Sequence, residues 1–156
     1  MIDTIKKLFQ PFMVVFSHVL KSPHTIKYPY ERLKFSPNFR GRHLLDIKKC
    51  VGCGMCAKIC PNNCITLIEV EKGKVRLPQI NLGSCSFCGL CARYCPHNAL
   101  TMTELVEIST DKRENLIYPP VKLAEPPSIK RVLPQLEKEI TVQVTKSKIK
   151  YIRRKV

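Results

Sequence analysis

Two short runs of cysteine carry most of the chemistry that this sequence could perform. CVGCGMCAKICP starts at residue 50 and CSFCGLCARYCP at residue 85, and both have the spacing C-x2-C-x2-C-x3-C-P. A disulfide framework does not fit them. Bridges within a run would close small strained loops, and 9 cysteines leave one thiol over. We therefore expect thiolates that bind metal in a reducing compartment.

The grouping of the cysteines favours iron–sulfur clusters, with zinc as the alternative metal. A structural zinc site takes four ligands from two short knuckles, whereas these runs supply two tight quartets. In the bacterial-type arrangement three cysteines of a run bind one cluster and the fourth binds the other. We predict two 4Fe–4S clusters. The expected ligands are Cys50, Cys53, Cys56 and Cys95 for cluster one, and Cys60, Cys85, Cys88 and Cys91 for cluster two.

Glycine and proline support these two runs at matching places. Pro61 and Pro96 follow the fourth cysteine of each run and end a short helical turn. Gly54 and Gly89 leave room for backbone N–H groups to approach a sulfur.

Three further residues near the runs are candidates for a role. Cys64, the ninth cysteine, is interpreted as a small buried residue, and a substitute ligand or redox sensor is the alternative. His43 and His97 are interpreted as surface or supporting side chains, and proton-coupled neighbours of a cluster are the alternative.

The elements that must position these cysteines form an internal duplication. Within residues 44–108 the two halves align at a constant offset of 35. Each half indicates a short strand, a cysteine loop, one helical turn and a second strand. The predicted fold class is α+β, a bacterial-type two-cluster ferredoxin fold with pseudo-twofold βαβ repeats. Because such a unit has a small core, metal–thiolate bonds must hold it together.

The segments on either side of this domain differ from it in composition. Residues 1–21 predict an amphipathic helix that is too short and too polar to span a bilayer, so it lies in a membrane interface or docks on another protein. Residues 22–43 predict an extended connector. Residues 109–156 predict an extended basic arm, ordered against a partner or disordered.

Charge separates the same segments. Residues 1–49 carry +7, residues 50–110 carry +1 and residues 111–156 carry +7 of the total of +15. Basic flanks favour an anionic surface, such as lipid headgroups or acidic subunits. Nucleic-acid binding with structural clusters is a remote alternative, because the tail lacks interleaved aromatic residues. We find no motif for a substrate site, so no catalytic residue is predicted.

The order of these motifs resembles a known family. YPYERL and FRGRH, followed by the two cysteine runs, are similar to the two-cluster ferredoxin-like subunit of complex I, which is subunit I of bacterial NADH–quinone oxidoreductase. Matching subunits exist in archaeal deazaflavin-coenzyme dehydrogenases, membrane-bound hydrogenases and sulfane-reductase complexes. The resemblance is strongest over residues 27–108, and CPNNCI also resembles the CPxxCI of some bacterial members.

This resemblance implies an electron-transfer subunit of an oxidoreductase, without a substrate site of its own. It would pass electrons toward the terminal cluster of a neighbouring small subunit near the membrane. The implied partners are hydrogenase-like large and small subunits, a membrane subunit, and the membrane surface through residues 1–21. The implied location is the cytoplasmic face of the cell membrane, as a peripheral protein. A diffusible two-cluster ferredoxin is the alternative, which the long flanks weigh against.

Overall fold

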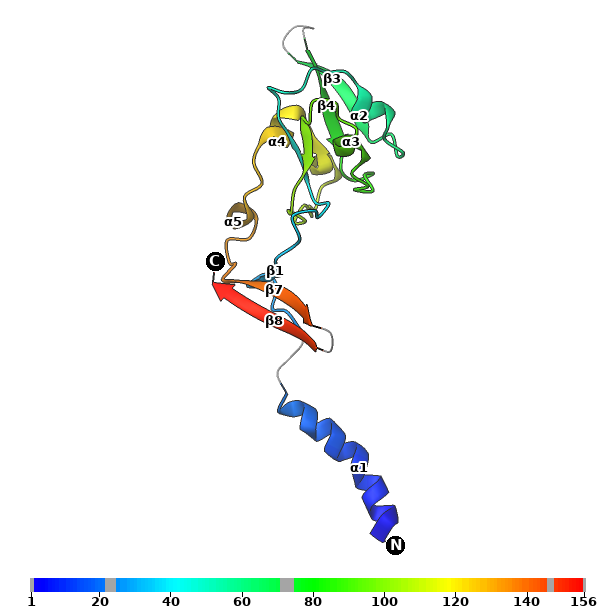
Figure 1. The fold of residues 1–156 in the computed structure, drawn as a ribbon, viewed down its shortest axis with the longest axis vertical. Coiled ribbons are helices and arrows are strands. Elements are labelled where there is room, and N and C mark those ends of the chain that lie inside the picture. The colour runs from blue at the N-terminus through cyan, green and yellow to red at the C-terminus, as the bar shows by residue number, and fades with distance from the viewer. Residues whose placement is uncertain (1, 22–24, 71–74, 146–147, 156) are drawn as a thin grey trace.

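A computed structural model describes residues 2–21, 25–70, 75–145 and 148–155 of this chain. The architecture combines short helices with three small sheets. In Figure 1 the cysteine-bearing domain lies at one end of the molecule, a three-stranded sheet lies in the middle, and the first helix lies at the other end. The chain thus separates its metal-ligating residues from its N-terminal apolar segment.

The first helix, α1 (Ile2–Val19), exposes its apolar side chains. Phe12, Phe16 and Val19 are 68%, 67% and 73% exposed, and Pro11 lies inside the helix. Among the described residues no helix has the length and apolar character needed to cross a bilayer. An exposed row of large apolar side chains on a helix indicates a surface that other molecules cover.

Two antiparallel strand pairs form the frame of the cysteine domain. Strand β2 (His43–Leu45) pairs with β5 (Leu100–Met102), and β3 (Ile65–Val70) pairs with β4 (Val75–Asn81). The register puts Leu45 opposite Leu100 and Ile80 opposite Ile65. The two pairs are equivalent under the offset of 35, because Leu45 corresponds to Ile80 and Ile65 corresponds to Leu100.

Backbone hydrogen bonds repeat with the same offset. The Asp46 N–H donates to the Ala99 carbonyl at 2.7 Å, and the Asn81 N–H donates to the Cys64 carbonyl at 2.8 Å. Helices α2 (Met55–Lys58) and α3 (Leu90–Arg93) occupy equivalent positions after the cysteine loops. The local structure of each half is therefore repeated in the other, and the two halves are tied together by reciprocal bonds.

The core of this domain lies between the strand pairs and a short C-terminal helix. Strand β6 (Ile117–Tyr118) follows the short 3-10 helix η1 (Arg113–Leu116) and pairs antiparallel with β4. Helix α4 (Pro120–Ala124) then buries Leu123 completely. The core side chains are Leu45, Cys64, Ile65, Ile80, Leu82, Cys91, Leu100, Tyr118 and Leu123. Residues C-terminal to the duplication thus contribute to the core of the cysteine domain.

The remaining C-terminal residues fold back on the connector. After α5 (Ile129–Val132), strands β7 (Lys138–Thr145) and β8 (Lys148–Lys155) form an antiparallel pair, and β1 (Glu31–Leu33) pairs in parallel with β7. Ile140 is fully buried there. We expected an extended connector and an extended arm from these segments. Their pairing joins residues about a hundred positions apart, and no local pattern in a three-residue strand indicates such a partner.

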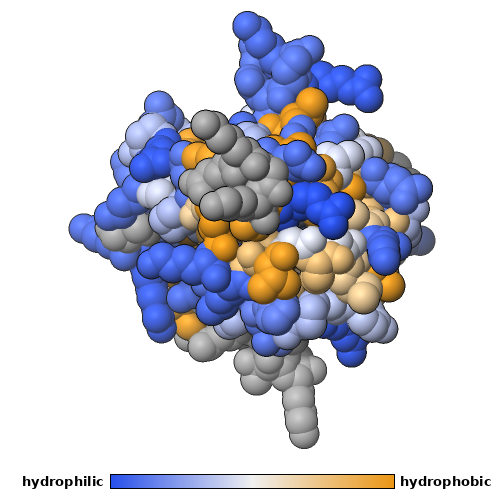
Figure 2. Space-filling model, turned by 90° about the horizontal axis from the view of Figure 1, so that it is seen from above, coloured by the Kyte–Doolittle hydropathy of each residue, from blue (hydrophilic) through white to orange (hydrophobic). Residues whose placement is uncertain are grey.

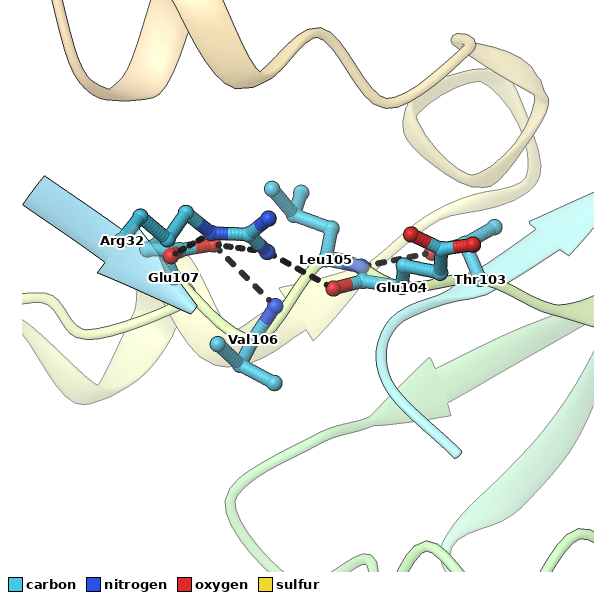
Figure 3. Close-up of polar contacts among 6 residues, drawn as sticks. All are labelled: Arg32, Thr103, Glu104, Leu105, Val106 and Glu107. Carbon is cyan, nitrogen blue, oxygen red and sulfur yellow. Dashed lines mark hydrogen bonds and ion pairs between the residues drawn. The ribbon is translucent and has the colours of Figure 1, made fainter. Parts of the chain in front are cut away.

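A buried ion pair fixes the connector to the end of the cysteine domain (Figure 3). Arg32 Nε donates to Glu107 Oε1 at 2.6 Å, and Arg32 Nη2 donates to the Glu104 carbonyl at 2.8 Å. The Arg32 and Glu107 side chains are 2% and 6% exposed. This pair attaches the YPYERL segment to the cysteine domain.

The FRGRH segment makes a second, backbone-mediated attachment. The N–H groups of Gly41 and Arg42 donate to the carbonyls of Thr103 and Leu105, at 2.8 and 2.7 Å. A Cβ atom at Gly41 would clash with both of these carbonyl oxygens. Glycine is therefore required here by a close approach of two backbone segments. The segment then continues into β2, which carries His43.

Candidate metal centres

Four cysteines line a first cavity at one side of the domain. Three come from the first run, and the fourth, Cys95, comes from the second run. The wall is completed mainly by apolar side chains, including Leu45, Leu67 and Leu100. These are the cysteines that the sequence assigns to cluster one: Cys50, Cys53, Cys56 and Cys95. The fold therefore gathers four thiols around one apolar space.

A second cavity is also lined by cysteines of both runs, but in the opposite proportion. Three of its cysteines come from the second run, and the fourth, Cys60, comes from the first run. These are Cys60, Cys85, Cys88 and Cys91, the set that the sequence assigns to cluster two. His43, Cys64 and Ser86 also line this cavity. The chain thus crosses between the two cavities, and each needs both runs.

Left-handed glycines turn each cysteine loop into its short helix. Gly54 and Gly89 precede α2 and α3 with φ of 76° and 77°. Any L-residue is strained in this conformation, so glycine is favoured at both positions. After the helices, Asn63 and Asn98 adopt φ of 49° and 47°. The fourth cysteine of each run lies between the short helix and this asparagine, and it lines the opposite cavity.

Backbone N–H groups point at some of the sulfurs. The Ala99 N–H donates to Cys95 Sγ at 3.3 Å, and the Phe87 N–H donates to Cys85 Sγ at 3.4 Å. Burial acts to raise the pKa of Cys95, but the N–H groups of residues 97–100 outweigh it, and the net pKa is lowered. The pKa of Cys60 is lowered in the same way, against its own burial. The two cysteines that cross between cavities thus carry N–H donors that favour the thiolate.

The cysteines on the short helices have the opposite tendency. Burial raises the pKa of Cys56, and burial raises the pKa of Cys91 to about 12, assisted by the charge of Cys85. An apolar site without a cation disfavours a thiolate. Iron in the cavity would reverse this preference, because a coordinating thiol is deprotonated by its metal.

Cys64 lies in the wall of the second cavity. Its side chain is 6% exposed, and its Sγ is 3.3 Å from Cys60 Sγ. Burial, with Cys60 as the next cause, raises the pKa of Cys64. The buried core position agrees with our interpretation of a small packed residue. Its contact with Cys60 was not predicted, because the spacing C-P-x-x-C does not indicate where the second sulfur points.

The two histidines near the runs differ in environment. His43 is 1% exposed, and burial lowers its pKa to about 4. Its Nδ1 is buried with no hydrogen-bond partner in the part of the chain that the structure describes. His97 lines the first cavity but is exposed to solvent. Sequence reasoning did not predict that His43 lines the second cavity. The offset of 35 makes His43 the counterpart of Pro78, but only the structure shows that Pro78 lines the first cavity.

The residues of both cavities fit a 4Fe–4S cluster each. Each cavity offers the four thiols that the spacing assigns to it, and the second also contains the Cys64 thiol and the buried Nδ1 of His43, which has no hydrogen-bond partner among the described residues. Among the described residues, no three His, Cys, Asp or Glu side chains form a group that could hold a single metal ion. The thiols line the walls of the cavities, as ligands of a multi-atom cluster do.

Residues 49–99 match the family described as the 4Fe-4S dicluster domain. This segment of the chain is similar to a 4Fe–4S dicluster domain. Its cofactors are two 4Fe–4S clusters, as the cysteine spacing predicts. The match covers both cysteine runs and the strand pair between them, so the prediction of a two-cluster ferredoxin-like domain is confirmed for this part of the chain.

Curated relatives extend the similarity beyond the dicluster domain. The chain is 40% identical over 128 residues to NAD(P)H-quinone oxidoreductase subunit I of Prochlorococcus marinus (strain MIT 9301), covering 79% of this chain and 62% of the relative. It is 48% identical over 54 residues to the chloroplastic subunit I of Chlorokybus atmophyticus, covering 35% of this chain and 31% of the relative. The predicted resemblance to subunit I is confirmed. The chain spans about 62% of the length of the Prochlorococcus relative.

A solved structure has a similar fold. It is the membrane-bound sulfane sulfur reductase (MBS), described as an archaeal respiratory membrane complex, with 38% sequence identity and a TM-score of 0.52. The alignment covers 65% of this chain and 55% of the matched chain. The relatives named by both comparisons are components of oxidoreductase complexes.

Proposed function

We propose that this chain is an electron-transfer subunit of a membrane-bound, complex I-like oxidoreductase. The observation that carries the proposal is the crossed composition of the two cavities, in which each run supplies three cysteines to one cavity and one to the other. An interlocked pair of cluster sites holds two redox centres close together. The similarity to quinone-oxidoreductase subunit I and to a respiratory membrane complex supports the assignment to such an assembly.

We propose the crossed ligand sets as the ligands of the two clusters. Cluster one takes Cys50, Cys53, Cys56 and Cys95, and cluster two takes Cys60, Cys85, Cys88 and Cys91. The shared cavity of each set supports this assignment. The repetition of strand register, helix position and backbone bonds at the offset of 35 supports a pseudo-twofold βαβ arrangement.

When bound, the clusters supply one-electron redox chemistry, and the protein supplies their environment. The apolar walls of the first cavity limit the access of water to its thiols. The N–H groups at Cys85 and Cys95 donate to sulfur and favour the more negative state of a bound cluster. In the proposed role the chain transfers electrons between redox centres, and the substrate site belongs to other subunits.

The proposed partners are the neighbouring subunits of such an assembly and a membrane surface. We propose that α1 lies at that surface, because its large apolar side chains are exposed. The cytoplasmic face is proposed from the resemblance to subunit I. On the cysteine domain Val51, Met55 and Tyr94 are also exposed, at 60%, 43% and 56%. Figure 2 shows the molecule from the end that carries the cysteine domain, and apolar side chains lie among hydrophilic ones on this face. Such mixed surfaces suit docking of neighbouring subunits.

Purification of the native assembly tests this function. A tagged full-length chain, recovered from detergent-solubilised membranes of its own organism, is expected to bring hydrogenase-like large and small subunits with it. Recovery of a free monomer from membrane-free lysate would support the diffusible ferredoxin instead. A steep, salt-dependent affinity for RNA or DNA would support the nucleic-acid alternative.

A further inference from the structure

His43 occupies an unusual position for a histidine, buried in the wall of a cavity. The side chain is 1% exposed, lies in β2, and lines the second cavity together with Cys60, Cys85 and Cys88. Its Nδ1 is buried without a hydrogen-bond partner among the described residues. A buried polar group without a partner destabilises the fold. The position is therefore explained best by an acceptor inside the cavity.

The other half of the domain provides an internal comparison. Subtracting 35 from Pro78, which lines the first cavity, gives His43 in the second. The same offset relates Val51 and Ala99 of the first cavity to Ser86 and Cys64 of the second. The first cavity thus has three apolar side chains where the second has three that can form hydrogen bonds.

Within that comparison the imidazole is the strongest donor. Neutral imidazole carries one N–H and the imidazolium carries two, so His43 can donate in either state. The Cys64 thiol is a weak donor. Ser86 lies in the cysteine loop directly after Cys85, one of the proposed ligands. His97 also lines the first cavity, but solvent competes for its N–H because it is exposed.

We propose that His43 donates an N–H hydrogen bond to a sulfur at cluster two and thereby raises the reduction potential of that cluster above that of cluster one. The proposal rests on the ligand sets proposed above. Reduction adds negative charge to a cluster, and a donor to its sulfurs stabilises the more negative state. At equilibrium a single electron on this subunit would therefore reside on cluster two. His43 acts as a positioning and tuning residue, since it is not itself a ligand.

Pulsed electron paramagnetic resonance tests the hydrogen bond directly. The full-length chain is labelled with ¹⁵N-histidine, loaded with iron and sulfide, and reduced by one electron per chain. We expect a weakly coupled histidine nitrogen in the spectrum of cluster two. The coupling should vanish in His43→Leu and His43→Gln and persist in His97→Asn. Absence of the coupling from a chain with two intact clusters overturns the proposal.

A redox titration measures the consequence. His43→Leu is expected to favour the oxidised form of cluster two by about tenfold, which is ~59 mV for a one-electron couple. His43→Gln, which keeps an N–H donor, should retain most of the wild-type potential. Pro78→Ala is the matched control, because it alters the equivalent position in the first cavity without removing a donor. An equal shift of both clusters in His43→Leu would contradict a local hydrogen bond.

Cluster content separates this inference from the proposed function. About eight irons per wild-type chain are expected from two 4Fe–4S clusters. Fewer than two clusters in the wild type would overturn the ligand sets and the inference together. If His43→Leu loses cluster two, the nitrogen coupling of the wild type and its loss in His43→Gln still decide the question. Two clusters without any histidine coupling would overturn the inference alone.

Discussion

At the scale of single residues, the fourth cysteine of each run joins the two cavities, because each cavity is lined by cysteines of both runs. The spacing of a run is local, so the ligand sets could be proposed from the sequence alone. His43 required two further facts, its burial and its equivalence to Pro78 at the offset of 35. A histidine in a connector is usually a surface residue, so the statistical expectation pointed away from the cavity.

Exchange of the fourth cysteine tests the crossed ligand sets. Cys60→Ala should damage cluster two, and Cys95→Ala should damage cluster one, because each lines the cavity of the other run. Cys60→Ala is best combined with Cys64→Ala, since Cys64 Sγ lies 3.3 Å from Cys60 Sγ and could replace it. Low-temperature electron paramagnetic resonance of the variants identifies the signal that is lost. Loss of the cluster bound by the same run would contradict the crossed assignment.

The buried ion pair of the connector also acts at the residue scale. Glu107→Gln removes the charge that Arg32 contacts at 2.6 Å and leaves a buried guanidinium without its carboxylate. Breaking such a pair costs about 3–5 kcal/mol. We expect the loaded full-length chain to lose its clusters at a clearly lower denaturant concentration, followed by the visible absorbance of the clusters.

An exposed pair supplies the control for that experiment. Lys49 and Asp46 are 3.1 Å apart, with side chains 62% and 41% exposed. Lys49→Gln should leave the stability almost unchanged, because water screens such exposed pairs. Equal effects of Lys49→Gln and Glu107→Gln would show that burial of the Arg32 pair does not stabilise the fold.

At the scale of elements, the duplicated unit follows from the sequence and the middle sheet does not. The repeat at 35 residues indicated the strands and helical turns of both halves. Strand β1 has three residues and no alternation, and its partner β7 is distant in the chain. The alternation of Ile140, Val142 and Val144 indicated a strand near the C-terminus. What it could not indicate was the strand with which it pairs.

Truncation of one core side chain tests the middle sheet. Ile140 is fully buried between β1 and β8, so Ile140→Ala should destabilise this sheet by about 2–4 kcal/mol. We expect faster amide hydrogen exchange in β1, β7 and β8, with unchanged spectra of both clusters. Val142→Ala is the control on the same strand, because Val142 is 39% exposed. Loss of the cluster signals in Ile140→Ala would mean that the sheet and the cysteine domain unfold as one unit.

At the scale of the whole molecule, the chain holds its apolar helix and its cysteine domain at opposite ends (Figure 1). The middle sheet and the Arg32–Glu107 pair form the connection to the cysteine domain. The basic flanks were visible in the charge distribution. Their arrangement was not, because distances between segments depend on pairings that composition does not encode.

Vesicle flotation tests the proposed membrane contact of α1. The full-length loaded chain is expected to float with vesicles that contain anionic lipid. Phe12→Ser with Phe16→Ser should reduce the bound fraction at least tenfold, because each buried aromatic side chain contributes about 1.5–3 kcal/mol. Ser17→Ala on the same helix is the control and should bind as the wild type does. Undiminished binding of the double variant would place the membrane contact elsewhere in the chain.

The crossing of the chain between the two cavities also bears on biosynthesis. A nascent chain that has left the ribosome only through its first cysteine run contains Cys60 but lacks Cys95, so neither four-thiol cavity is complete. The second run finishes both at nearly the same moment. Under the proposed ligand sets neither cluster can be completed before residue 91 has been synthesised, so the two runs cannot be loaded one after the other.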